Sequence, residues 1–437
     1  MVNDPSKDLL TIFDITTQSE TAVAAFGNNI VVAYNDSGEY YSTNSYSGYS
    51  RSADGGASFA DLGTMPIAAT EISIGVPALV VDRAGTFYYA EIAIDAARPP
   101  GFESTVAISK STDGGQHFGA TVYPPSAGVS ANSTQDKEFL AVDTTSGPFA
   151  GNLYLSWTSI DPGSTIFFSR STDGGASFST PIPISAAGEV NQYSEPAVGP
   201  NGDVYVAWFQ FSHPYVSLDP GAILVAKSID GGVHFGTPVT VTAVPEIGFL
   251  GGNLIGNFRA NSAPRVDVNP INGDVCIVFA ANPPGLDGAD IYFTRSTDGG
   301  GHWSNPTRVN DDATNNDQFF PDLAINQDGV VDVIWYDRRL DPNNLKIDVF
   351  RARSVDGGQS FRPNQRVTST SSFPAVGYDP INKQPSYMGD YIDIKAETTG
   401  SGRGKNFVLA WGDFRRIIST PRGNRPDQDV VFTLLKP

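Results

Sequence analysis

The sequence predicts an all-β protein built from one repeated unit, and three observations lead to this prediction. An eight-residue phrase, Ser-x-Asp-Gly-Gly-x-x-aromatic, recurs at intervals of 57 to 68 residues, with copies beginning at Ser52, Ser111, Ser171, Ser228, Ser296 and Ser354. Runs rich in β-branched and aromatic residues surround the copies, as strands require. No stretch has the composition of a linker, so we expect one domain over residues 1–437. A fixed period of this length indicates an array of supersecondary units that cannot bury their apolar faces alone.

Each copy of the phrase predicts a tight turn. The paired glycines supply the positive φ angles that side-chain-bearing residues adopt only at a cost. The Asp can accept hydrogen bonds from backbone N–H groups inside the turn, and the Ser can add a weaker one. Six equivalent carboxylates in six equivalent turns are better explained by structure than by catalysis or metal binding.

Two further strands are predicted before each copy of the phrase. The unit that contains Ser228 shows them as residues 195–198 and 203–208, separated by a turn at Asn201-Gly202. Equivalent second strands are expected at residues 30–34, 86–90, 153–157, 275–279, 331–335 and 406–411. The last unit has strands at 391–394, 406–411 and 429–433 but no phrase and no fourth strand. We therefore expect residues 9–15 to complete it from the N-terminus.

The phrase resembles the Asp box of the sialidase superfamily, also called the bacterial neuraminidase repeat. In that superfamily the box forms the turn between the third and fourth strands of a β-propeller blade, and all six copies here fit the pattern. The resemblance implies a β-propeller of four-stranded antiparallel blades. Sialidases have six blades, but the count of units in this chain predicts a seven-bladed propeller closed by the N-terminal segment. Such closure protects sheet edges that would otherwise be open. A six-bladed propeller with irregular ends is the alternative.

Composition restricts the partners. The chain has 28 basic and 47 acidic residues, a net charge of −19, which argues against nucleic acid and anionic membranes. No apolar run approaches the roughly 20 residues that span a bilayer, and Met1–Asp8 lacks the apolar core of a secretory signal. Few lysines and many Ser, Thr, Asn and Gly residues favour an extracellular or periplasmic protein whose leader is absent. Cys276 is alone in a predicted strand and is expected to fill core space.

Propeller geometry sorts the remaining residues by face. The loop that enters the first strand and the loop between the second and third strands share one face, and the repeated turn lies on the opposite face. Three of the four histidines, at 117, 234 and 302, lie within the repeated turns, and only His213 lies on the other face. We therefore predict no multi-histidine metal site and no histidine-based triad. No cofactor is expected, although Ca²⁺ held by Asn261, Asn315 or Asn316 with carboxylates is an alternative.

Charged and aromatic residues collect where the first strands begin, and these are the candidate site. The candidate catalytic residues are Glu138, Glu195, Asp322, Asp390 and Tyr391, and Arg259 and Arg265 are candidate substrate ligands. Aligning three successive units puts Glu195, Arg265 and Asp322 in one register. We predict that these three side chains and Tyr391 line one pocket. The alternative is that the charges pair and plug the central channel.

A second signal occurs at the ends of two second strands. The element Trp-x-Asp-x-Arg appears as Trp335, Asp337 and Arg339, and again as Trp411, Asp413 and Arg415. Asp–Arg pairs favour bidentate geometry, which suits either an anionic ligand or the locking of a loop. Asp337, Arg339, Asp413 and Arg415 are therefore candidate substrate-binding residues.

The resemblance also implies glycan chemistry. Sialidases use an arginine triad, a tyrosine nucleophile activated by a glutamate, and an aspartate acid/base. The chain contains these residue types at Arg259, Arg265, Arg339, Arg415, Tyr336, Tyr391, Glu138, Glu195, Asp136, Asp322 and Asp390. It lacks the Phe/Tyr-Arg-Ile-Pro element that precedes the first box in sialidases, since Arg51 is the one arginine before Ser52. We therefore expect a glycosidase-like activity on carbohydrate rather than sialidase activity proper.

The alternative is a non-catalytic propeller that binds a glycan or a protein partner on the same face, because fold alone does not decide function. The two hypotheses differ in geometry. An enzyme should hold two carboxylates, or a Tyr–Glu pair, within about 5–10 Å at an accessible site. A binding scaffold should cap each carboxylate with an arginine and leave no open cavity.

Overall fold

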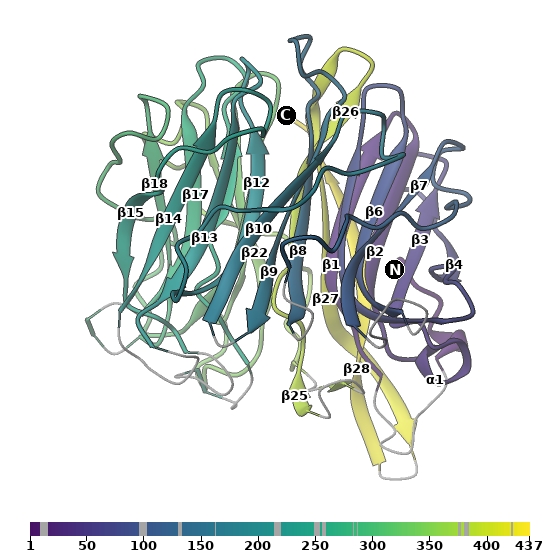
Figure 1. Ribbon diagram of the computed structural model, residues 1–437. Helices are drawn as coiled ribbons and strands as arrows, with labels where there is room; N and C mark the ends of the chain where they lie inside the picture. The colour runs from purple at the N-terminus through teal and green to yellow at the C-terminus, as the bar shows by residue number, and fades with distance from the viewer. Residues whose placement is uncertain are drawn as a thin grey trace.

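The computed structural model describes residues 1–8, 16–95, 103–129, 133–161, 163–213, 220–248, 254–255, 259–282, 284–285, 287–374, 377–379, 384–420 and 423–437. Over these ranges the protein is all-β. Helix is limited to η1 (Pro5–Lys7) and α1 (Tyr40–Thr43). Neither is long and apolar enough to cross a membrane. Figure 1 shows the strands standing in twisted sheets placed side by side.

The strands follow one another as antiparallel meanders, each of which we call a unit and name by its strands. In chain order they are β1 (Gln18–Phe26), β2 (Asn29–Asp36), β3 (Ser47–Ser52) and β4 (Ala60–Thr64); β5 (Glu71–Val81), β6 (Phe87–Asp95) and β7 (Glu103–Ser111); β8 (Thr134–Val142), β9 (Leu153–Asp161), β10 (Gly163–Ser171) and β11 (Ile182–Pro183); β12 (Val190–Val198), β13 (Val204–Phe211), β14 (Gly221–Ser228) and β15 (Val239–Val244); β16 (Arg265–Val268), β17 (Val275–Ala281), β18 (Asp290–Ser296) and β19 (Thr307–Arg308); β20 (Gln318–Ile325), β21 (Val331–Asp337), β22 (Asp348–Ser354) and β23 (Gln365–Arg366); and β26 (Asp393–Thr399), β27 (Gly402–Thr420) and β28 (Gly423–Leu435). A separate hairpin joins β24 (Gly377–Asp379) and β25 (Gln384–Tyr387).

The predicted second strands lie inside β2, β6, β9, β13, β17, β21 and β27, except that Thr86 and Asp203 come one residue before β6 and β13, and most of the observed strands are longer than predicted. The first strand of the last unit begins later than predicted, at Asp393 instead of Tyr391. Ahead of this start, the backbone carbonyl of Asp390 accepts a hydrogen bond from the Asn261 side chain at 3.0 Å.

The Asp-Gly-Gly turns satisfy their own polar groups. At the copy that begins at Ser171, the Ser hydroxyl donates to Asp173 Oδ1 at 2.7 Å and accepts from Gly175 N–H at 2.9 Å. Asp173 also accepts from the N–H and hydroxyl of Ser177. Gly174 and Gly175 have φ angles of 66° and 74°, which explains the paired glycines. These hydrogen bonds, that of the Ser177 hydroxyl first, lower the pKa of Asp173 to about 2.

The first and last units are joined. The sheet order β28-β27-β26-β1-β2-β3-β4 places β1 beside β26 in parallel. Val2 N–H donates to the Val430 carbonyl at 2.8 Å, and Val430 N–H donates to Asn3 Oδ1 at 2.9 Å. The N-terminus therefore lies against β28, although the predicted closing segment, residues 9–15, is outside the described residues. The long β27–β28 hairpin extends past the lower ends of the other strands (Figure 1).

The apolar core lies between facing sheets. The largest cluster combines residues from β17, β21 and β27, among them Val278, Trp335 and Leu409. Cys276 is fully buried in β17, in agreement with a core-filling role, and burial raises the pKa of its thiol.

Candidate functional site

The first strands share an irregularity on the face where they begin, which we call the strand-start face and which is the lower edge of Figure 1. Each of five first strands slips register near its start. At the slip a non-glycine residue takes a left-handed conformation, with φ between 50° and 60°, at Glu20, Val76, Lys137, Tyr193 and Phe320. Such conformations cost about 1–3 kcal/mol each and concentrate at functional sites. Bulges of this kind re-aim side chains.

Two of these left-handed residues, Glu20 and Lys137, belong to a buried ion-pair network together with Arg259 and Asp390. We call these four residues the central cluster. Lys137 Nζ lies 2.8 Å from Glu20 Oε1 and 2.7 Å from Asp390 Oδ2. Arg259 donates to both oxygens of Asp390, from Nε at 2.6 Å and from Nη2. The cluster therefore joins residues from four different units or their entering loops.

Burial and the neighbouring charges shift the pKa values of two carboxyl groups at this cluster. Although burial opposes its ionisation, Arg259 and Lys137 hold the pKa of Asp390 well below its usual range. Glu138, next to Lys137 in the chain, is fully buried, and neither carboxyl oxygen has a hydrogen-bond partner among the described residues. Burial raises the pKa of Glu138 well above its usual range. One carboxyl is thus ionised and the other neutral.

A second group, the Tyr193 pocket of Asp136, Gln192, Tyr193 and Glu246, adjoins Arg259. Burial raises the pKa of Tyr193, and the charges of Asp390, Arg259, Asp136 and Glu246 also act on its phenol. In the described part of the chain the Tyr193 hydroxyl, Gln192 Oε1 and Glu246 Oε1 are buried without a hydrogen-bond partner. Burial raises the pKa of Glu246 to about 7.

Arg265 lies across the central channel. Its guanidinium nitrogens are 3.8 Å from Glu195 Oε1 and 3.8 Å from Asp322 Oδ1. The guanidinium carbon is 4.5 Å from the Phe139 ring centre and 4.9 Å from that of Tyr391.

The structure therefore brings Glu195, Arg265, Asp322 and Tyr391 together, but all four are buried. The hollow beside them measures about 10 Å³, room for about one water, and the Tyr391 hydroxyl donates to the Pro77 carbonyl.

Glu195 and Asp322 also tie neighbouring first strands together. Glu195 Oε2 accepts from Val266 N–H at 3.0 Å, and Asp322 Oδ2 accepts from Ile394 N–H at 2.9 Å. Asp393 repeats this contact between the last and first units, since its Oδ2 accepts from Val23 N–H at 2.7 Å. Each carboxylate joins its own first strand to the first strand of the next unit. The equivalent positions of Glu195 and Asp322 in the sequence alignment therefore have a structural role.

A larger cavity of about 620 Å³ lies on the other side of Arg265, among the distal halves of the first strands. Four of its charged lining groups are ion-paired, and Arg83 donates to the backbone carbonyls of Gly400 and Thr145. Lys395 Nζ lies 3.4 Å from Glu195 Oε1 and 3.2 Å from Asp393 Oδ1, and Arg403 binds both oxygens of Asp267 at 2.6 Å. This volume is typical of ligand pockets.

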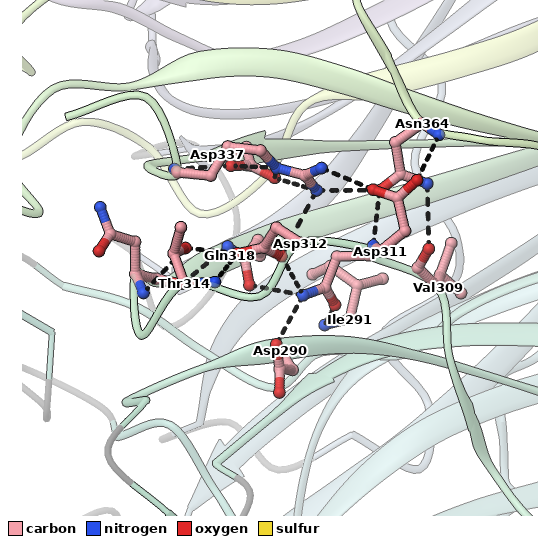
Figure 2. Close-up of polar contacts among 12 residues, drawn as sticks. Asp290, Ile291, Val309, Asp311, Asp312, Thr314, Gln318, Asp337 and Asn364 are labelled. Atoms are coloured by element: carbon pink, nitrogen blue, oxygen red, sulfur yellow. Dashed lines mark hydrogen bonds and ion pairs between the residues drawn. The ribbon is translucent and has the colours of Figure 1, made fainter. Parts of the chain in front are cut away.

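The two Trp-x-Asp-x-Arg elements are internally bonded. Asp337 accepts from the Trp335 indole at 2.7 Å and from Arg339 Nε at 2.9 Å and 3.0 Å. Arg339 also binds Asp311 and Asn364, and Figure 2 draws Asp337, Asp311 and Asn364 as parts of one polar network. Asp413 accepts in the same way from Trp411 and from two nitrogens of Arg415. The first element therefore holds the segment that follows β21, and the second holds the register shift between Asp413 and Arg416 within β27.

The amides considered for calcium face backbone carbonyls. Asn261 donates to the Asp390 carbonyl at 3.0 Å, and Asn316 donates to the carbonyls of Arg338 and Asp341. Their nitrogen atoms, rather than their oxygens, are directed at these neighbours.

Comparison with known proteins fixes the fold. No protein-family model matches the chain, and no curated protein matches its sequence. Among solved structures, an ulvan lyase, a polysaccharide lyase bound to -[GlcA(1-4)Rha3S]-, aligns with a TM-score of 0.58 at 9% identity, over 97% of this chain and 94% of that one. A leech intramolecular trans-sialidase with 2,7-anhydro-Neu5Ac aligns with a TM-score of 0.50 at 12% identity, over 84% of this chain and 70% of that one. These likenesses show the fold alone: the chain is a β-propeller, similar in fold to these two enzymes.

Sequence reasoning missed part of the site on this propeller. Lys137, Glu20 and Glu246 were not among the candidates, because ion pairs between residues more than 100 positions apart leave no local pattern. Asp393 could have been found, since it pairs with Ala410 across its hairpin as Glu195 pairs with Ala207. Gly75 accompanies Val76 at one of the five bulges, but no glycine accompanies the left-handed residue at the other four, so those positions carry no glycine signal in the sequence.

Proposed function

We propose that this protein is a carbohydrate-processing propeller of the glycoside-hydrolase type that acts on the strand-start face. One observation carries the proposal. Two carboxyl groups whose charges act on the Tyr193 phenol have pKa values shifted in opposite directions, since burial raises that of Glu246 to about 7, and Arg259 and Lys137 hold that of Asp390 low. Environments that push the pKa values of neighbouring carboxyls apart identify an acid and its ionised counterpart.

The residues divide the chemistry between them. Protonated Glu246 would donate its proton to the glycosidic oxygen as the C–O bond breaks. A water molecule would supply the hydroxyl at the anomeric carbon, and the proton that this water releases would return to the Glu246 carboxylate. Ionised Asp390 would stabilise the positive charge that develops on the sugar. The Tyr193 hydroxyl and Gln192 Oε1 would bond sugar hydroxyls, which would satisfy buried atoms that otherwise lack partners. Glu138, buried and neutral, would serve as a second proton donor beside Lys137.

We also propose that the propeller is one domain with seven blades, one for each unit, and that it works outside the cytoplasm. The N-terminal contacts of Val2 and Asn3 with Val430 support closure between the last and first blades. Glu195 and Asp322 act in this proposal as interblade clamps, and Arg265 as the plug of the channel.

The test is a panel of aryl glycosides, a sialoside and uronate-containing polysaccharides, with released reducing ends as the readout. We expect turnover of at least one substrate, and about 100-fold or greater loss in Glu246→Gln and in Tyr193→Phe. Asp203→Asn is the matched control, because Asp203 pairs with Lys227 at 2.8 Å near the opposite face, and it should retain activity. Inactivity of the folded wild-type protein on the whole panel would overturn the proposal.

The second candidate is a propeller that binds carbohydrate without cleaving it. It is favoured by a specific observation: Asp390, Glu195 and Asp322 all lie against cations, and the adjoining hollow is about 10 Å³. Calorimetry with the same glycans separates the two. Binding without turnover, weakened by Tyr193→Phe and unchanged by Glu246→Gln, would establish this candidate in place of the first.

A further inference from the structure

The cavity of about 620 Å³ beyond Arg265 takes no part in the proposed glycan chemistry. Its outer lining includes Arg83, Thr145, Pro200 and Ser401, which lie in turns between a first and a second strand. In an antiparallel meander these turns share a face with the Asp-Gly-Gly turns, so the cavity opens opposite the strand-start face. Pockets for small molecules have volumes of about 300–1,000 Å³, so the cavity has room for such a ligand.

Part of the cavity wall is apolar. Val80, Val142, Val198 and Ala396 come from four different first strands, β5, β8, β12 and β26, and each of them lines the cavity while only half-buried. Removing apolar surface of this kind from water is favourable in proportion to the area that a ligand covers. The wall therefore favours a ligand with an apolar body over a fully hydrophilic one.

The charged lining of the cavity has more positive than negative groups. Its members are Arg83, Lys395 and Arg403 on one side of the balance and Glu195 and Asp267 on the other. Glu195 accepts from Val266 N–H at 3.0 Å and from Lys395 Nζ at 3.4 Å, and both oxygens of Asp267 bind Arg403 at 2.6 Å. The two carboxylates are thus satisfied within the protein, which leaves an excess positive charge in a chain of net charge −19.

Arg83 carries this excess charge. Its Nε donates to the Gly400 carbonyl and its Nη1 to the Thr145 carbonyl, both at 3.0 Å, whereas its Nη2 takes part in neither bond. Among the described residues no carboxylate forms an ion pair with Arg83. Gly400 and Thr145 lie in the turns of two different units, so these bonds hold the guanidinium at the mouth of the cavity. A planar guanidinium with one edge open is well suited to a carboxylate.

We propose that this cavity binds a small amphipathic carboxylate, with the carboxylate group on Arg83 and the apolar body against the half-buried valines and Ala396. Lys395 bounds the inner end of the cavity. Its ammonium lies 3.4 Å from Glu195 Oε1 and 3.2 Å from Asp393 Oδ1, so its charge is already balanced and Arg83 is the anchor. The site would give the protein a second ligand, on the face opposite to the proposed glycan chemistry.

The experiment is calorimetric titration of the whole protein with octanoate, and with octanol as the uncharged molecule of the same chain length. We expect one octanoate per chain, bound at least about 10-fold more tightly than octanol, because hydrogen bonds between two charged groups are the stronger ones. Arg83→Met should lower the octanoate affinity about 10-fold and leave the octanol affinity unchanged. The matched control is Arg170→Met, since Arg170 donates to the Gly231 carbonyl at 3.2 Å on the same face, and it should change neither affinity.

A second variant tests the apolar wall. Ala396→Phe keeps Arg83 and fills part of the cavity, so it should weaken the binding of both octanoate and octanol at least about 10-fold. The proposal is overturned if the folded wild-type protein gives no binding heat with millimolar octanoate, if octanoate and octanol bind equally well, or if either Arg83→Met or Ala396→Phe keeps the wild-type affinity for octanoate. Glycan turnover is not a readout here, so this result is independent of the proposed function.

Discussion

The two faces of this propeller are built on opposite principles. On one face, six Asp-Gly-Gly turns repeat the same hydrogen bonds with the same glycine conformations. On the strand-start face, each unit differs: left-handed Glu20, Val76, Lys137, Tyr193 and Phe320 occupy matching positions with unrelated side chains. The comparison teaches that the repeated residues build the architecture, and that the residues able to do chemistry are those in which the units depart from one another.

Carboxyl groups show the same contrast. Asp173, in an exposed turn, has its pKa lowered to about 2 by hydrogen bonds from Ser177 and Ser171. Glu246, on the strand-start face, has its pKa raised to about 7 by burial. The first group is ionised at all physiological pH values, whereas the second titrates where a catalytic acid must.

The largest expected effect comes from removing the central lysine. Lys137→Met should destabilise the protein by about 3–5 kcal/mol, because it leaves Glu20 and Asp390 buried beside one another with one cation fewer. The matched control is Lys110→Met, since Lys110 donates to the Gly174 carbonyl at the turn face and its loss should cost under about 1 kcal/mol. Urea denaturation of both variants makes the comparison. Equal losses of unfolding free energy in Lys137→Met and Lys110→Met would contradict the distinction between the two faces.

A buried glutamate on β6 gives the next largest effect, and it depends on pH. Burial raises the pKa of Glu91 from 4.5 to about 7, so the folded protein holds a proton that the unfolded chain has lost. Its favourable contribution is complete below about pH 4.5 and is lost as pH rises through about 7. Ionisation of Glu91 should therefore lower the free energy of unfolding of the wild-type protein by up to about 3 kcal/mol between pH 4.5 and 8. In Glu91→Gln this decrease with pH should be absent. Denaturation curves at several pH values test this, and an unchanged pH profile would contradict it.

The clamp at Asp393 should have an intermediate effect. Asp393→Ala removes the carboxylate that accepts from Val23 N–H and should cost about 2 kcal/mol, because it leaves a buried N–H without a partner. The loss should appear as faster hydrogen exchange at Val23, between the first and last units, with little change elsewhere. Unchanged protection at Val23 would show that the clamp contributes nothing.

The smallest effect is expected at the turn face. Ser177→Ala removes one of several hydrogen bonds to exposed Asp173 and should cost about 0.5 kcal/mol, because the other donors to that carboxylate remain. Urea denaturation measures this change in the free energy of unfolding. A loss as large as that of Asp393→Ala would contradict the view that each single hydrogen bond in these turns contributes little to stability.

The sequence predicted the repeated parts well, because they carry local signals. Paired glycines and strand-forming runs located the turns and the second strands, and one register aligned Glu195, Arg265 and Asp322. The strand-start face was harder, since its contacts are long-range. Lys137 bonds a residue 117 positions away, and Arg259 bonds one 131 positions away. Pairings of this kind, and the protonation states that follow from them, are decided by packing and leave no pattern in the chain.

The most direct test of the account is the pH dependence of turnover for wild-type protein and Glu246→Gln on the best substrate of the glycan panel. We predict that wild-type activity falls as pH rises above about 7, since the acid must be protonated. We also predict that Glu246→Gln loses this alkaline limb together with about 100-fold in rate. A wild-type pH profile in Glu246→Gln, or no turnover of any glycan by the folded protein, would contradict the assignment of glycan chemistry to the strand-start face.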